Sequence, residues 1–506
     1  MRNFFFTSFI NKYSSTALVL WMFFPLISFS QLKIATISFK GNTVFSSAQI
    51  LQQFTLHPND TLRQELLEQD IHQLISRYEN IGYPFAQVSV ANIEEVQVQS
   101  EQKLNIVLEI QEGAIIHVNE IRASGNKETD TQVIIRESGI TRGEVYSEER
   151  LSKVKSKLNK LDIFSSVGNP ELTVNDSGGV ITIPVEESAT TTFDGVLGYN
   201  PAVNGNEGYF TGLVLVAFRN LFGTARKLNV AWKRESGDVS EIGVRYKEPW
   251  LFNQPLNAIL GFNQRQQDSS FVVRNFDIQL DARVMDDLSV GLLFAQENII
   301  PSSNSIGARL FDTRTSTIGF EVNYDTRDDI VSPTSGVLFK SNYHTGKKTS
   351  SSTFQSETKS TIERLGLDFA FVVQPFQRQV ISTELHGREL LTDNIGIGEM
   401  FRLGGTTTLR GFKESQFIGS KIAWTNVEYR FLLSRRSFFF GFFDTGYYFI
   451  PENPGQAIVS SQEYTYGYGV GIKLETAIGI VGVNIALGEG DSFSQAKLHF
   501  GLFNEF

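Results

Sequence analysis

Apolar and polar residues alternate along most of the chain from about Thr192 onward. Ile278 and Leu280 flank the polar Gln279, and residues 464–474 repeat the same two-residue period. This period predicts β-strands with one apolar and one polar face. A transmembrane barrel would turn the apolar face to lipid and the polar face to its lumen. An antiparallel sandwich in water also alternates, so the pattern alone leaves both architectures open.

The N-terminal segment favours the membrane alternative. Residues 1–30 combine the positive Arg2 and Lys12, an apolar run at 16–29 and a small-x-small site at 28–30. This combination predicts a cleaved secretory signal peptide, since the apolar run is shorter than the ~20 residues of a spanning helix. After residue 31 no run of apolar residues is long enough for such a helix. Backbone groups in lipid must be paired within the protein, so strands can span only as a closed barrel.

The length from residue 191 to residue 506 sets the size of this barrel. About twenty residues for each strand and its connection, with tilted spans of ~10 residues, permit about sixteen strands. The 42 Phe and 15 Tyr also suit a lipid-facing surface. We therefore predict an antiparallel transmembrane β-barrel over residues 191–506.

Two smaller α+β units are predicted before the barrel, at residues 31–112 and 113–190. Gly41-Asn42 and Gly125-Asn126 mark the same turn in each unit, 84 residues apart. In the first unit we predict strands at 33–40, 86–93 and 103–112, a short helix capped by Ser46 and Gln49, and a helix over 61–80. In the second unit we predict a helix from Ser147 whose buried face carries Leu151, Val154, Leu158 and Leu161, and last strands at 172–174 and 180–185. Such repetition indicates a modular array.

The segment from Phe401 to Phe412 is the most specific motif of the chain. It reads Phe-Arg-Leu-Gly-Gly-Thr-Thr-Thr-Leu-Arg-Gly-Phe and lies among the predicted barrel strands. It resembles the tip of the inward-folded loop of the BamA/TamA-like outer-membrane assembly and translocation family, and the two units resemble the POTRA repeats of that family. Further matches follow in family order at Asn220–Gly223, Glu248–Phe252, Tyr324–Asp328, Asn426–Arg430 and Phe443–Gly446.

The resemblance implies a lumen site built on this loop. The loop motif residues are Gly404, Gly405, Leu409, Arg410, Gly411 and Phe412. A guanidinium inside a barrel needs carboxylate partners, and the family pattern assigns these to Glu428 and Asp444. In the two-residue period of its strand, Glu428 falls on the polar face, which is expected to point into the lumen. Asp444 falls on the same face of its strand as Phe440 and Phe442. Either a bulge moves Asp444 to the opposite face, or the lumen wall is aromatic there.

The last strand is expected to be a sorting signal for assembly machinery. Its apolar face carries Leu498, Phe500, Leu502 and the C-terminal Phe506. The chain would then itself be a client of such machinery.

Several chemistries are not expected. There is no Cys for a disulfide or thiolate site, and the net charge of −10 disfavours nucleic acid as a partner. The six His show no ligand spacing, and Asp325, Asp328 and Asp329 lack the pattern of a calcium loop, so we expect a solvated turn and no metal. Gly467, Gly469 and Gly471 precede no helix and are predicted to be small inward residues of a strand. We expect no cofactor, no catalytic residue and no enzyme.

The leading functional hypothesis is an outer-membrane insertase of a Gram-negative bacterium, with its repeats in the periplasm. It would guide unfolded outer-membrane proteins by edge-strand templating, in contact with outer-membrane lipids and periplasmic or lipoprotein accessory subunits. The repeats would either capture extended clients at a sheet edge or serve as spacers and docking platforms. The alternative is a two-partner-secretion type exporter, although the first predicted strand at 33 leaves no room for a plug helix. A plain porin would have no use for the repeats.

Overall fold

The computed structural model divides the chain into two compact units, Met1–Ile115 with the first repeat and Ile116–Phe506 with the second repeat and the barrel. The predicted signal segment and the C-terminal Phe506 lie outside the described residues. These are residues 32–99, 101–200, 209–234, 239–267, 270–302, 311–330, 332–352, 355–434, 436–453, 458–476 and 479–503.

The first repeat packs two helices on a three-stranded sheet. Its elements are β1 (Lys33–Lys40), α1 (Ser47–Leu51), α2 (Gln64–Asn80), β2 (Gln87–Val98) and β3 (Glu101–Gln111). β3 is central, parallel to β1 and antiparallel to β2. The predicted capping box of Ser46 and Gln49 starts α1. The α2 positions Leu67, Leu74 and Tyr78 are buried in the core.

The two largest differences from the predicted boundaries of the first repeat are at the start of the long helix and at the end of β2. The long helix begins at Gln64 rather than Thr61, because Thr61 forms a bridge with Lys33 and the Leu62 amide donates to the Leu32 carbonyl. These residues extend the sheet and are not available to the helix. β2 continues to Val98, five residues beyond the predicted end, because it pairs with β3 along its whole length.

The second repeat contains one strand that the sequence did not reveal. Its elements are β4 (Val118–Ser124), α3 (Thr131–Ser138), α4 (Glu148–Asn159), β5 (Phe164–Val167), β6 (Glu171–Asn175) and β7 (Gly178–Glu187). β7 is central and pairs with the other three strands. The four-residue β5 is too short for a periodic signal. Leu151, Val154 and Leu158 are buried as predicted, and Leu161 packs partly buried against the same core.

The same steric requirement explains the glycine of the Gly-Asn turn in both repeats. Gly41 and Gly125 have φ of 81° and 92°, which residues with a Cβ rarely adopt. A Cβ on Gly41 would lie 2.2 Å from the Ile110 carbonyl oxygen, and one on Gly125 would lie 2.0 Å from that of Val185. Glycine is therefore required where the turn crosses the central strand.

A glutamate at the end of each central strand binds the loop after the turn. Glu112 accepts the amide protons of Thr43 and Val44 at 2.7 and 2.9 Å. In the second repeat, the Glu187 carboxylate accepts those of Lys127 and Thr129 at 2.9 and 2.6 Å. Partial burial raises the pKa of Glu187, but a hydrogen bond from the Thr129 side chain and the hydrogen bonds from the loop amides outweigh this effect and lower the pKa from 4.5 to about 2. The carboxylate is thus a structural cap of the repeat.

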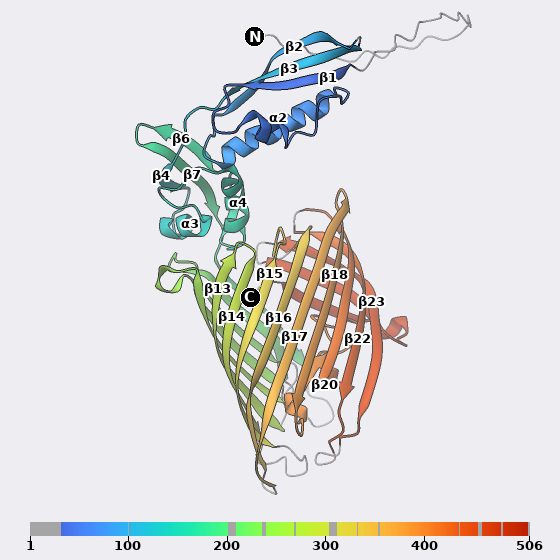
Figure 1. Cartoon of the computed structure of the whole chain (residues 1–506). Helices are drawn as coiled ribbons and strands as arrows, with labels where there is room; N and C mark the ends of the chain where they lie inside the picture. The colour runs from blue at the N-terminus through green and yellow to red at the C-terminus, as the bar shows by residue number, and fades with distance from the viewer. Residues whose placement is uncertain are drawn as a thin grey trace, which may run out of the picture. The chain divides into compact units, whose positions relative to one another are not determined.

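The barrel is one antiparallel sheet of sixteen strands that curls around a lumen (Figure 1). The strand order follows the chain and ends at β8 and β25. A separate pair, β19 (Phe401–Leu403) and β20 (Phe417–Gly419), interrupts the sequence between β18 and β21. The barrel strands are β8 (Thr191–Asn200), β9 (Tyr209–Leu221), β10 (Arg226–Arg234), β11 (Ser240–Glu248), β12 (Leu256–Gln267), β13 (Phe271–Met285), β14 (Leu288–Pro301), β15 (Asp312–Asp325), β16 (Gly336–Ser352), β17 (Gln355–Phe376), β18 (Gln379–Thr392), β21 (Lys421–Leu432), β22 (Phe438–Ile450), β23 (Ser461–Thr476), β24 (Gly479–Gly488) and β25 (Lys497–Phe503).

Exposure follows the predicted alternation. In β23, Tyr464 and Val470 are 77% and 64% exposed, whereas Thr465 between them is buried. Within the described parts of the chain, no helix has the length and apolar character needed to cross a bilayer. The predicted fold class of two α+β repeats followed by a sixteen-stranded antiparallel barrel is confirmed.

The pKa of Glu187 generates a prediction about acid stability. Because its folded pKa is below the ~4.3 of an unfolded glutamate, the stabilisation is present above that value and is lost as pH falls toward 2. At pH 7, Glu187→Gln should lower the local unfolding free energy around residues 127–129 by about 1–3 kcal/mol. Hydrogen exchange of the full-length protein measures this value, and the difference from wild type should shrink below pH 4.

Glu186→Gln is the matched control, because Glu186 is exposed and adjacent. An effect of Glu187→Gln that is equal at pH 7 and pH 3 would contradict the cap.

Candidate functional site

The loop between β18 and β21 folds back inside the barrel. It includes a 3-10 turn, η2 (Ile397–Glu399), followed by β19 and β20, which pair with each other and hold the segment 404–416 as a compact tip. Gly404 and Gly405 open the tip with φ of 113° and 102°. The Gly405 amide donates to the Leu409 carbonyl at 3.0 Å, which closes the turn before Arg410.

Arg410 is buried between two carboxylates of the barrel wall. Its Nε and Nη2 donate to the two oxygens of Asp444, each at 2.7 Å, and its Nη1 donates to Glu428 Oε1 at 2.5 Å. The Arg410 backbone amide adds a bond to Asp444 at 3.1 Å. The side chains of Arg410, Glu428 and Asp444 are 7%, 9% and 0% exposed. The structure thus brings together the three residues that the family resemblance grouped, in a bidentate geometry that only arginine supplies.

The orientation of Asp444 follows from an aromatic lumen wall. β22 pairs with β21 and β23 without a register shift, so no bulge intervenes. Phe438, Phe440 and Phe442 are buried on the same inward face as Asp444. The Arg410 guanidinium carbon lies 3.8 Å from the Phe442 ring centroid, a cation–π contact. Of the two alternatives for Asp444, the aromatic lumen is the one present.

Arg430 extends this ion-pair network. Its Nε donates to the second oxygen of Glu428 at 2.7 Å, so Glu428 joins two arginines. Arg430 is 5% exposed and stacks over Phe438. The motif assigns no role to Arg430, although Arg430 lies two residues after Glu428 and therefore on the same face of the strand.

Glycines on the wall let the loop backbone approach closely. A Cβ on Gly467 of β23 would lie 1.9 Å from the Arg410 carbonyl oxygen, and one on Gly446 of β22 would lie 2.8 Å from the Leu409 side chain. Gly411 has φ of 93°, and its Cβ would meet the Leu487 backbone at 2.6 Å. Gly467 faces inward, as the sequence indicated, and the reason is contact with the loop.

Apolar packing completes the tip. Leu409 is fully buried and Phe412 is 7% exposed. Both belong to one cluster with Leu403, Trp424 and Tyr448 on β19, β21 and β22.

A second buried ion pair anchors the first part of the loop. Lys348 Nζ of β16 lies 2.6 Å from Glu399 Oε2 of η2, and both side chains are 2% exposed. The ammonium group also donates to the Asn394 carbonyl at 3.1 Å. This pair could not be predicted from the sequence, because no periodicity links a strand residue to a loop residue 51 positions away.

The remaining predicted positions lie apart from this site. Leu498 is 70% exposed on the outer face of β25, whereas Phe500 and Leu502 are placed only by the backbone of that strand, and Phe506 lies outside the described residues. Asp329 is buried and pairs with Arg436 at 3.2 Å, so the turn is not wholly solvated as expected. In the described ranges, no group of three or more acidic, His or Cys side chains is arranged to hold a metal ion.

Removing the guanidinium should destabilise the barrel. Arg410→Ala leaves two buried carboxylates without their shared partner, which costs about 3–5 kcal/mol. The temperature at which the folded form disappears on a heat-modifiability gel should fall clearly. Arg245→Ala is the control, since Arg245 is half-exposed and makes one 3.4 Å ion pair, worth about 0–1 kcal/mol. Equal transition temperatures for the two variants would argue against a buried lock.

A methyl group on the wall should displace the loop without touching any charge. Gly467→Ala places a Cβ where the Arg410 carbonyl lies, so we expect the tip to detach and protease added from outside to cleave the chain near Lys413. Gly441→Ala, on the neighbouring strand, meets no atom within 4 Å and should leave the loop protected. Equal protection of both variants would contradict close docking.

The chain matches two known protein families. The Omp85 superfamily domain matches residues 220–506, and the surface antigen variable number repeat, POTRA, matches residues 32–113 and 116–188. The outer membrane protein assembly factor BamA of Nitratidesulfovibrio vulgaris is 23% identical over 173 residues, which are 33% of this chain and 22% of that relative. The chain therefore aligns with less than a quarter of that curated relative's length.

Solved structures share the fold. BamA from Haemophilus ducreyi lacking POTRA domains 1–3 has a TM-score of 0.50 at 15% identity and covers 93% of this chain and 98% of that chain. CdiB from Escherichia coli has a TM-score of 0.55 at 13% identity, with coverages of 93% and 89%. At these identities the likeness concerns the fold alone. Because the Omp85 match covers more than half of the sequence, the chain belongs to the Omp85 superfamily of outer-membrane β-barrel proteins with periplasmic POTRA repeats.

Proposed function

We propose that this protein is an outer-membrane assembly factor that guides β-barrel clients into the membrane at the edges of its own sheet. The observation that carries the proposal is the strand order, which ends at β8 and β25 without a register pair between their described residues. The described part of β25, Lys497–Phe503, pairs with β24 on one side, and no described residue of β25 has a register partner in β8 on the other. The seam between β8 and β25 is the weakest part of the wall.

Edge pairing supplies the driving force. Unpaired N–H and C=O groups in hydrocarbon are costly, and a client strand added at the seam would satisfy them. Each strand that the client adds renews the edge for its next strand. Folding of the client provides the free energy, so the mechanism needs no nucleotide or other cofactor.

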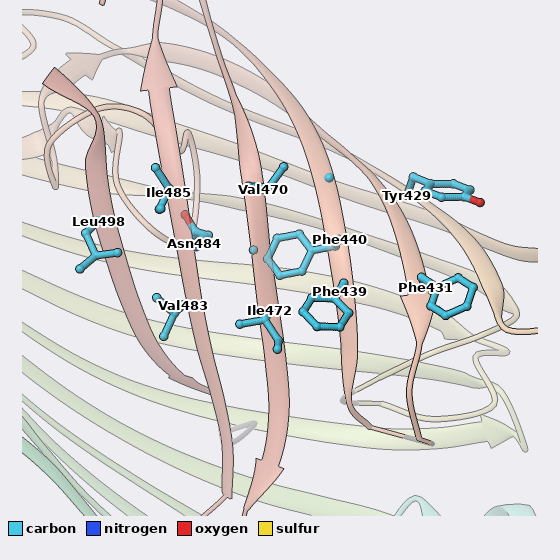
Figure 2. A pocket seen from close by; sticks show the side chains of 12 residues that line it. Tyr429, Phe431, Phe439, Phe440, Val470, Ile472, Val483, Asn484, Ile485 and Leu498 are labelled. Carbon is cyan, nitrogen blue, oxygen red and sulfur yellow. The ribbon is translucent and has the colours of Figure 1, made fainter. Parts of the chain in front are cut away.

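An apolar hollow on the outer wall supports a role for this side of the barrel. It has a volume of about 540 Å³ and spans β21 to β25, ending at Leu498 beside the seam (Figure 2). Tyr429, Phe439 and Ile485 line it, and Gly441 adds no side chain at its floor. The hollow offers space for apolar side chains of an entering client.

The first repeat supports client capture. β2 is an edge strand of twelve residues on which Val90, Ile93 and Val98 are 37–45% exposed. An extended, unfolded segment can add to such an edge through backbone hydrogen bonds. The register shift between Val90 and Asn92 limits indiscriminate pairing. The same repeats would serve as docking platforms for accessory subunits.

We infer that Arg410 acts as a structural lock and that the protein is not an enzyme. The Arg410 guanidinium and its two carboxylate partners form ion pairs with one another. Because all three side chains are buried, a substrate could not reach them. The lock holds the loop against β21 and β22, close to the last strands of the sheet. It therefore supports the wall next to the seam.

Export of one partner protein through the lumen is the competing function. The two-repeat architecture and the loop motif fit an exporter as well as an insertase. The loop inside the barrel, anchored by both Arg410 and Lys348, would have to leave before a chain could pass. This requirement favours insertion of clients at the barrel wall over export through the lumen.

Quantitative outer-membrane proteomics after depletion of the protein distinguishes the two functions. We expect many unrelated β-barrel proteins to decline, and rescue by wild type and by Arg245→Ala. Arg410→Ala should rescue poorly in proportion to its own reduced level or stability, which the same measurement quantifies. Loss of a single large secreted protein with all other barrels unchanged would overturn the insertase and support the exporter.

A further inference from the structure

Two turns at the repeat end of the barrel each present an exposed phenylalanine. Residues 222–225 connect β9 to β10, and residues 249–255 connect β11 to β12. Phe222 and Phe252 are 86% and 84% exposed, the largest exposed fractions among the large hydrophobic residues that the structure describes. The lock and the seam give neither residue a role.

The backbone of both turns is held in an unfavourable conformation. Phe222 has φ of 57°, and Trp250 and Phe252 have φ of 53° and 55°. Residues with a Cβ rarely adopt positive φ, and such strain persists only where the surroundings fix it. Ordinary turns would avoid this strain. We therefore infer that the exposure of the two rings has a function.

The second repeat fixes both turns from one side. The Asp130 amide donates to the Gly223 carbonyl at 2.8 Å, and Ala225 is buried in the core of the repeat. In the other turn, Trp250 Nε1 donates to Glu137 Oε1 at 2.7 Å. The repeat therefore holds each turn through other residues, while the phenylalanine of that turn stays exposed. These contacts also place both turns at the periplasmic end of the barrel.

The adjoining strands set the depth of the turns. β11 is nine residues long, which is about the minimum for a tilted strand that crosses a bilayer, and β10 pairs with it from Lys227 opposite Lys247, so the two turns lie at the same level of the wall. The ends of such strands coincide with the boundary of the hydrocarbon layer. Aromatic side chains are favoured at this boundary, because the rings leave water while the backbone stays at the headgroups.

We propose that Phe222 and Phe252 insert into the periplasmic leaflet of the outer membrane and anchor the second repeat against the bilayer. The partner is the lipid surface, and the turns are the mechanical link between lipid and repeat. This anchoring does not depend on whether the protein inserts clients or exports a partner, so its test is independent of the proposed function.

The absence of cysteine from the chain allows a direct measurement of depth. Single variants Phe222→Cys, Phe252→Cys and Gln254→Cys are spin-labelled in the full-length protein and reconstituted in phospholipid vesicles. Gln254 is the matched control, because it is exposed in the same turn as Phe252. We expect labels at 222 and 252 to collide with oxygen several-fold more than with a water-soluble nickel chelate, relative to the label at 254.

Two outcomes would overturn the proposal. Equal accessibility ratios at all three positions would place the phenylalanines in water, and low collision rates with both reagents would show that protein covers them. The link to the repeat has its own readout in Phe222→Ser/Phe252→Ser. This double variant in vesicles should speed hydrogen exchange around Asp130 several-fold, and unchanged exchange would refute anchoring.

Discussion

Pairing of every backbone group in hydrocarbon is the constraint on which the rest of this structure depends. It forces sixteen strands into one sheet and gives each strand an apolar and a polar face. It also concentrates the cost of opening at the two terminal strands, β8 and β25, whose described residues form no register pair with each other. The proposed function follows from this imbalance, since a client strand can pair where the barrel itself pairs least.

The same constraint applies to the loop inside the lumen. A loop enclosed by the wall must satisfy its charges and backbone there, and Arg410 does so with Glu428 and Asp444 while Gly467 on β23 makes room for the Arg410 backbone. Charge and close approach are separate requirements, met by different residues. The Lys348–Glu399 pair anchors the other part of the loop to a different strand, so the loop is fixed at two points.

The second repeat is joined to the membrane domain by ordinary local chemistry. Glutamates at the ends of the central strands cap the Gly-Asn loops, and turns of the barrel contribute to the core of the second repeat through Ala225. The motifs Asn220–Gly223 and Glu248–Phe252, which the sequence offered only as family signals, are thereby explained as docking turns. Their strained, exposed phenylalanines give the membrane a further point of contact.

The sequence by itself determined the alternation of the barrel and the duplicated Gly-Asn turn, because both are expressed in residue type and spacing, whereas the grouping of Arg410 with Glu428 and Asp444 came from the resemblance of its motifs to a known family. It placed the start of α2 too early and missed β5, since a bridge at Thr61 and a four-residue strand leave no periodic signal. Only the tertiary structure decided that Asp444 shares an aromatic wall, that Gly467 receives the loop and that Lys348 meets Glu399. These depend on which strands become neighbours across the lumen, and pairing between distant segments is not encoded in local pattern.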